Sequence, residues 1–152
     1  MKLPWQKDKP LFTEEEQQRL VQAIQNAEQR TSGEVRLFIE PHCRYVHALD
    51  RAQEIFFEYK MNETALHNGI LIYVAVKDHQ AAVYGDEGIH RAVGPEYWKK
   101  VVAKMFAHFA HDHLTTGICA AIEELGEALY HYFPYDQKTD KNELPDEIIF
   151  GR

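Results

Sequence analysis

The spacing of apolar residues switches between helical and strand-like periods along the first third of the chain. Thr13 and Glu16 stand at the spacing of a capping box, which marks the start of a helix. Apolar residues then recur at three- and four-residue intervals, and this period predicts an amphipathic helix over residues 14–30. From residue 34 the pattern alternates, with Val35 and Leu37 on one face. Residues 34–40 are therefore predicted to form a strand.

The next stretch predicts one further helix and two strands. After Pro41, apolar residues at helical spacing predict a helix over residues 46–59. Residues 70–76, ILIYVAV, are apolar at nearly every position, which is typical of a central strand covered on both faces. A short polar turn, KDHQ, separates this strand from residues 81–85, AAVYG, which we expect to pair back as a hairpin.

Two longer helical patterns follow the hairpin. Pro95 suits the first turn of a helix, and apolar and aromatic residues continue at helical spacing to Phe109. A further helix is predicted to be capped by Thr115 or Thr116 and to extend to about residue 132.

The order of these elements predicts one α/β domain. A helix between the first two strands makes them parallel through a right-handed crossover, and the hairpin makes the third strand antiparallel. Helices must then cover both faces of a small mixed β-sheet, so the predicted fold class is a three-layer α/β/α sandwich. After residue 133 the composition becomes polar and acidic. We therefore divide the chain into an N-terminal extension (1–12), the α/β/α domain (13–133) and a polar acidic C-terminal tail (134–152).

Composition and charge narrow the class of protein. The chain has 152 residues, 45% of them hydrophobic, which is enough for one domain with its own core. Its formal net charge of -7 argues against nucleic acid as a partner, because binding to phosphates needs a basic surface. The longest apolar run, residues 70–76, is too short to cross a bilayer, and the N-terminus lacks the apolar core of a signal peptide. We therefore expect a cytoplasmic protein without a membrane span.

Oxygen-bearing side chains gather, in this topology, at one end of the sheet. The first two strands start there, and the third strand runs the opposite way, so the segment after it, GDEG, arrives at the same end. The residues expected to converge are Ser32, Glu34, Asn62, Thr64, Asn68, Asp86 and Glu87. Carboxylates, amides and backbone carbonyls are the ligands that Ca²⁺ takes in proteins. Asn-Gly and Gly-Asp are also ordinary turn chemistry, so an acidic, solvated turn without an ion remains the alternative.

Three short motifs occur in the order and at the spacing of a known family. They are TSGEV at residues 31–35, NGIL at residues 68–71 and YGDEG at residues 84–88. Together with the helix-forming segment FTEEEQQRL, they resemble the TPM domain family, which includes thylakoid acid-phosphatase-like and photosystem II repair-associated domains and their bacterial relatives. The resemblance covers residues 12–133 and implies an α/β/α sandwich, in agreement with the fold expected from the pattern.

The resemblance also implies a divalent-cation site, usually described as calcium, beside the glycine-acid loop. By motif position it places Glu34 at the family's strand-start glutamate, Asn68 at its Asn-Gly and Glu87 at the acid between the loop glycines. Asp86 departs from the pattern, since many members have an apolar residue there. The departure either adds a carboxylate to a cation site or marks a subgroup with altered ligands. Many relatives carry a secretion signal and a membrane anchor, whereas we expect this chain to be a short, soluble, free-standing member.

Two functions from different classes remain open at this point. The first is a calcium-binding domain without enzymatic activity, with an interaction or regulatory role, in which the ion orders loops that meet an unknown protein partner. The alternative is a metal-dependent, acid phosphatase-like hydrolase of small phosphate esters, an activity attached to part of the family. Ester hydrolysis needs a nucleophile or activated water and cationic groups, yet the sequence shows no P-loop, no Cys-x5-Arg and no Asp-x-Asp pair. We therefore prefer the first function and assign no catalytic residue.

Overall fold

The computed structural model describes residues 11–109, 113–135 and 148–151, and within them the chain forms five helices and four strands. In chain order the elements are α1 (Glu14–Glu28), β1 (Glu34–Glu40), α2 (Ala48–Glu58), β2 (Gly69–Ala75), β3 (Gln80–Gly85), α3 (Glu87–Val93), α4 (Pro95–Phe109), α5 (Leu114–Tyr132) and β4 (Ile148–Phe150). The predicted capping box is present, since Thr13 N donates to Glu16 Oε1 at 2.9 Å and Glu16 N donates to Thr13 Oγ1 at 3.1 Å.

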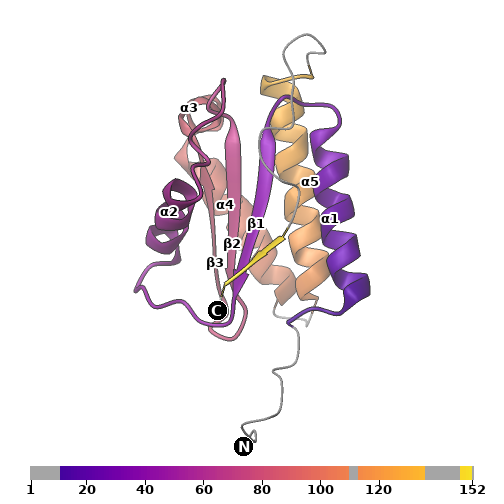
Figure 1. Ribbon diagram of the computed structural model, residues 1–152, viewed down its shortest axis with the longest axis vertical. Coiled ribbons are helices and arrows are strands. Elements are labelled where there is room, and N and C mark those ends of the chain that lie inside the picture. Colours follow the sequence, from indigo (N-terminus) through magenta and orange to yellow (C-terminus); the bar gives the residue numbers. More distant parts are fainter. Residues whose placement is uncertain (1–10, 110–112, 136–147, 152) are drawn as a thin grey trace, which may run out of the picture.

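A mixed sheet with the strand order β3-β2-β1-β4 forms the middle layer (Figure 1). β1 pairs in parallel with both β2 and β4, while β2 and β3 form the predicted antiparallel hairpin. The crossover through α2 gives β1 and β2 the same direction, as the order of elements predicted. β1 and β2 occupy the centre of the sheet, and every residue in both strands is buried.

Helices cover both faces of this sheet, so the predicted α/β/α sandwich is confirmed. Figure 1 shows α2 on the left of the sheet and α1 and α5 on its right. Alternate residues of β1 divide between two cores because successive side chains of a strand point to opposite faces. Leu37 and Ile39 pack with Leu125 of α5, whereas Phe38 packs with Ile55 of α2.

The structure differs from the sequence prediction at three places. The pattern did not indicate α3, which immediately follows β3, or β4, which pairs in parallel with Leu37–Ile39. The predicted cap of the last helix is wrong: His113 is the N-cap residue, and Thr115 lies inside α5. The Thr115 hydroxyl instead donates to Glu16 Oε2 at 2.6 Å and joins α5 to the first turn of α1. Residues 1–10 and 136–147 lie outside the described residues, so the predicted extension and most of the predicted tail stay predictions.

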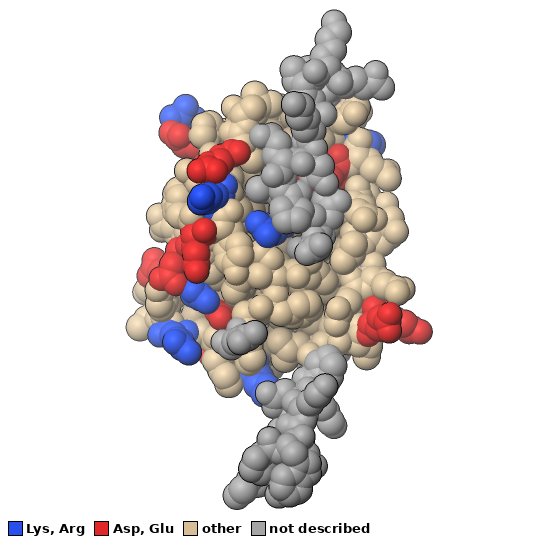
Figure 2. All heavy atoms as spheres, in the orientation of Figure 1, with Lys and Arg blue, Asp and Glu red and all other residues tan. Residues whose placement is uncertain are grey.

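Charged side chains of both signs are intermixed on the face shown in Figure 2. Lysine and arginine alternate there with aspartate and glutamate along the edge that α2 and α3 form in Figure 1. The described part of this face therefore carries no extended field of a single sign, which is the feature that would attract a polyanion. Within the same described residues, no helix has the length and apolarity that crossing a bilayer requires.

Candidate functional site

The starts of β1 and β2 and the end of β3 meet at one end of the sheet. Glu34 faces Gly69 in the parallel register, and Asp86 N donates to Gly69 O at 2.9 Å. Glu34 N donates to Asn68 O at 3.4 Å. The three segments thus meet through their backbones, as the topology predicted. Whether their side chains hold a metal ion stays a prediction.

Asp86 is the N-cap residue of α3, so the GDEG segment is a turn from strand into helix. Its Oδ1 accepts a hydrogen bond from Glu87 N at 2.8 Å, which satisfies one of the free amides at the start of the helix. Its Oδ2 lies 3.2 Å from Nδ1 of His67, and the Asp86 side chain is only 9% exposed. The carboxylate therefore has a structural role in joining α3 to the loop before β2.

The two glycines of the YGDEG motif are explained by close packing. A Cβ on Gly85 would lie 2.3 Å from Cζ2 of Trp98, a ring that covers the end of β3. A Cβ on Gly88 would lie 2.4 Å from the carbonyl oxygen of Leu66. Both distances are far below van der Waals contact, so a side chain at either position would force the neighbouring segment to move.

His67 is a residue of this site that the sequence analysis missed. It adopts a left-handed backbone conformation with φ of 50°, which is uncommon for a residue other than glycine. This conformation turns its carbonyl toward α3, where it accepts from Gly88 N at 2.8 Å and from Ile89 N at 3.3 Å. No pattern in the sequence indicates these contacts, because they depend on the turn of a loop. The only available signal was its position directly before the Asn-Gly pair.

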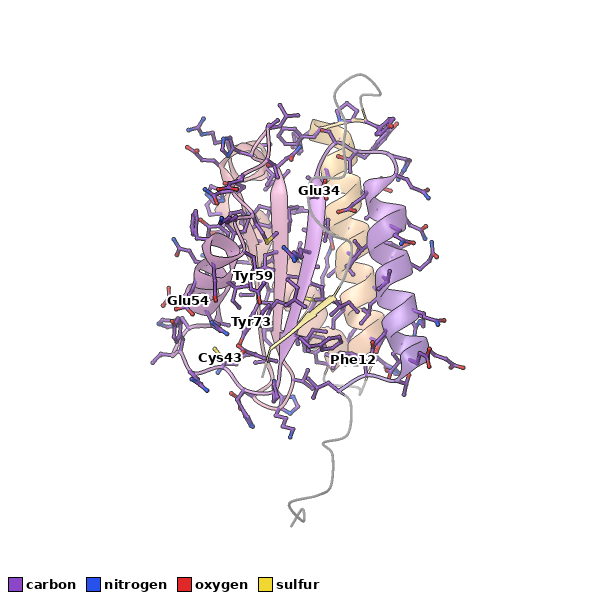
Figure 3. The ribbon with its side chains drawn as sticks, in the orientation of Figure 1. Phe12, Glu34, Cys43, Glu54, Tyr59 and Tyr73 are labelled. Atoms are coloured by element: carbon purple, nitrogen blue, oxygen red, sulfur yellow. The ribbon has the colours of Figure 1, made fainter. Side chains whose placement is uncertain are left out.

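The other three predicted ligands lie in different surroundings. Glu87 is the first residue of α3, with its side chain 65% exposed and Oε1 accepting from Arg91 Nη2 at 2.6 Å. Glu34 is buried at the start of β1, where Figure 3 labels it at the upper end of that strand. Asn68 is also buried, and its amide donates to Ser32 Oγ at 3.3 Å. Asn68 therefore joins the start of β2 to the segment before β1.

A cleft of about 500 Å³ opens beside this end of the sheet. Asp86 and Glu87 both line it, together with His67, Asn62 and the aromatic ring of Trp98. Glu34 and Asn68 do not line it, so the structure brings two of the four predicted ligands into one cleft. Within the described residues, no group of three or more His, Cys, Asp or Glu side chains is placed to hold a metal ion.

At the opposite end of the sheet, the buried carboxylate of Glu40 forms an ion pair with Arg51. Arg51 donates to Glu40 through Nε at 3.0 Å and through Nη2 at 3.1 Å, and the Tyr73 hydroxyl donates to Glu40 Oε2. Burial, and then the hydrogen bond to Glu40, raise the pKa of Tyr73 far above its usual value. Figure 3 shows Tyr73 below Glu34, toward the other end of the strands. This cluster joins β1, β2 and α2, and it is distinct from the cleft.

Two solved structures share the fold of this chain. The NMR structure of the BA42 protein from the psychrophilic bacterium Bizionia argentinensis is similar, with a TM-score of 0.85 and 38% sequence identity over 95% of this chain and 99% of that chain. The N-terminal domain of the cg2496 protein from Corynebacterium glutamicum has a TM-score of 0.62 at 10% identity, over 78% of this chain and 74% of that chain. At that identity the second likeness shows a shared fold alone.

The family follows from the sequence. Residues 6–128 match the model of the TPM domain. The chain belongs to the TPM domain family, as the three short motifs indicated. Among functionally curated proteins, none is similar enough to match.

Proposed function

We propose that this TPM domain is a divalent-cation-binding domain with an interaction or regulatory role, and that it binds Ca²⁺ through Asp86 and Glu87. The observation that supports the proposal is the cleft that Asp86 and Glu87 line together with Asn62. Carboxylate and amide oxygens are the ligands that Ca²⁺ prefers. Glu34 and Asn68, the two other ligands expected from the resemblance, would act from the buried strand starts that support this cleft.

The small number of protein ligands sets the expected affinity. Ca²⁺ takes six to eight oxygen ligands, and two carboxylates with one amide leave several positions to water or backbone carbonyls. Sites with few charged ligands bind weakly, so we expect a dissociation constant of about 0.1–1 mM. Such a site responds to millimolar rather than micromolar calcium.

Calcium binding would change the contact between the loop before β2 and α3. Oδ2 of Asp86 now lies 3.2 Å from the His67 ring, and an ion at this oxygen competes with the ring for it. Oδ1 keeps its bond to Glu87 N, so α3 stays capped while the His67 side chain is released into the cleft. The proposed response to calcium is therefore a local rearrangement at the cleft, where a partner could detect it.

Calorimetric titration with Ca²⁺, with Mg²⁺ as the comparison ion, tests this proposal. Asp86→Asn removes the charge but keeps a good N-cap residue, so the fold should persist while calcium binding weakens at least about tenfold. Glu87→Gln should weaken binding as well. Glu127→Gln is the matched control, because Glu127 is also 65% exposed and also pairs with an arginine, Arg30, away from the cleft. Absence of binding at millimolar calcium, or equal losses in the Glu127 variant, would refute the proposed site.

One observation favours the hydrolase as a second candidate. The buried carboxylate of Asp86 orients the ring of His67 in the same cleft, and a carboxylate that holds an imidazole is an arrangement used in general acid–base catalysis. Turnover of p-nitrophenyl phosphate with Ca²⁺ or Mg²⁺ tests it. Activity that disappears in His67→Gln while the variant stays folded would support the hydrolase. Absence of turnover with either ion would exclude the hydrolase and would leave the calcium-binding domain as the proposed function.

A further inference from the structure

β3 is an edge strand whose outer backbone groups have no partner among the described residues. Asp86 N donates to Gly69 O, and in an antiparallel pair the residues that bond to the neighbouring strand alternate with those that do not. The N–H and C=O groups of Ala81, Val83 and Gly85 therefore point away from β2, toward the open edge. No residue in the described part of the chain donates to these groups or accepts from them. Val83 is only 2% exposed, so side chains beside this edge must move aside before another strand can pair with it, and a buried backbone group without a partner is costly.

An apolar groove follows this edge between α2 and α4. It has a volume of about 540 Å³, with Ala81 to Val83 at its floor. Val46 and Leu49 form one wall, and Phe106 belongs to the other. These three side chains are 87%, 51% and 38% exposed, although each is large and apolar. Exposed apolar side chains gathered around one groove are typical of an interaction site.

The groove continues into the cleft at the end of β3. Leu49, Val83, Trp98 and Lys99 line both, so the two hollows form one channel along the strand. β3 has six residues, and an extended segment beside it would span about 20 Å. The opposite edge of the sheet shows that this fold accepts an added strand, because β1 is covered there by the short apolar segment Ile148–Phe150.

The charges along the channel indicate the chemistry of its occupant. Among the residues that line the groove, Lys99 is the one lysine, arginine, aspartate or glutamate, so the groove suits apolar side chains. The cleft at the far end carries Asp86 and Glu87. A complementary segment is apolar beside Ala81 to Val83 and basic beside the two acids.

We propose that the channel along β3 binds an extended segment of a partner protein by strand addition. The segment pairs antiparallel to β3, with alternating β-branched residues in the groove and lysine or arginine at its N-terminal end, beside Asp86 and Glu87. Its backbone supplies the missing hydrogen bonds to Ala81, Val83 and Gly85, and the groove walls select its side chains. β3 is in contact with α2 and with α4, so a helix lies on either side of the channel, which favours a single extended segment over the sheet of a second copy. The proposal does not depend on calcium.

The probe is the peptide acetyl-Lys-Lys-Val-Thr-Val-Thr-Val-amide, added to the ¹⁵N-labelled full chain in the presence of EDTA. In the proposed register its three valines face Gly85, Val83 and Ala81. Saturable shifts of the amide signals of these three residues are expected, together with slower hydrogen exchange at the same amides. The same peptide with N-methyl groups on the three valines keeps its side chains but loses the donors that face β3, so it should bind at least about tenfold more weakly.

Two variants of the chain complete the test. Leu49→Glu places a charge in the groove wall and should weaken peptide binding at least about tenfold. Leu66→Glu is the matched control, because Leu66 is also 51% exposed but lines neither hollow. No shift at millimolar peptide, equal binding of the methylated peptide, or equal weakening by both variants would overturn the proposal. Self-association through β3 without peptide, abolished by Leu49→Glu in sedimentation, would assign the edge to a second copy and would also overturn it.

Discussion

Replacement of Gly88 by alanine tests whether the contact between the loop before β2 and α3 is rigid. The new Cβ would lie 2.4 Å from Leu66 O and 2.6 Å from His67 O. Both are backbone atoms, which cannot rotate away as the end of a flexible side chain can. The same His67 carbonyl accepts from Gly88 N at 2.8 Å and from Ile89 N at 3.3 Å. Relief of the clash must therefore lengthen or break these two hydrogen bonds.

The expected loss follows from these contacts. Two hydrogen bonds contribute about 1 kcal/mol each, and overpacking adds about 1–3 kcal/mol. Alanine in place of glycine within a helix offsets up to about 1 kcal/mol. We therefore expect Gly88→Ala to lower the free energy of unfolding by about 2–4 kcal/mol, and the melting temperature by roughly 4–16 °C.

Urea unfolding followed by circular dichroism measures this loss. Ala92→Gly, a change in the same helix without a comparable clash, serves as the control and should cost about 0.5–1 kcal/mol from helix propensity alone. A Gly88→Ala protein within about 0.5 kcal/mol of the parent would show that the loop moves aside freely. That result would refute close packing as the reason for the second glycine of the YGDEG motif.

Three further predictions concern stability. Asp86→Ala should cost about 1 kcal/mol in urea unfolding because the α3 cap is lost, whereas Asp86→Asn should keep most of it; equal losses would contradict the capping role. The hydrogen bond from Thr115 lowers the pKa of Glu16 below its ordinary value of 4.5, so the parent should be more stable than Glu16→Gln above that pH. The difference should shrink as the pH falls through the lowered pKa, and a constant difference in unfolding measured from pH 7 to 2 would count against it. Leu37→Ala should cost about 2–5 kcal/mol, since Leu37 is fully buried in the larger core, and a loss below 1 kcal/mol would be inconsistent with that packing.

The longer elements could be predicted from the sequence because their apolar periods extend over several turns or residues. β1 is an example: alternation at Val35, Leu37 and Ile39 directly reports the face that packs on α5. α3 has only seven residues, and the GDEG segment, which contains its start, was interpreted as a turn. Asp86 as an N-cap, followed by Ile89 and Val93 at helical spacing, was a usable signal. β4 is too short for alternation to be detected, and its pairing depends on tertiary contacts with β1.

The candidate site could be predicted only in outline. Topology alone indicated that the strand starts and the GDEG segment share one end of the sheet. It could not indicate that Asp86 caps a helix, that the Asn68 amide donates a hydrogen bond to Ser32 or that Glu34 is buried outside the cleft. These outcomes depend on side-chain direction and on the left-handed backbone of His67, neither of which a one-dimensional pattern contains.

The parallel pairing of β4 with β1 has a consequence for how the protein is made. β1 lies in the first third of the chain, and its outer neighbour is formed by residues 148–150. During synthesis, α1, β1, α2 and the hairpin leave the ribosome long before that segment exists, at about 5–20 residues per second. Until translation reaches Ile148, a growing sheet presents β1 as a bare edge, which is the kind of surface that nascent chains use to aggregate. The strand that covers this edge, β4, is translated after the other three strands of the sheet.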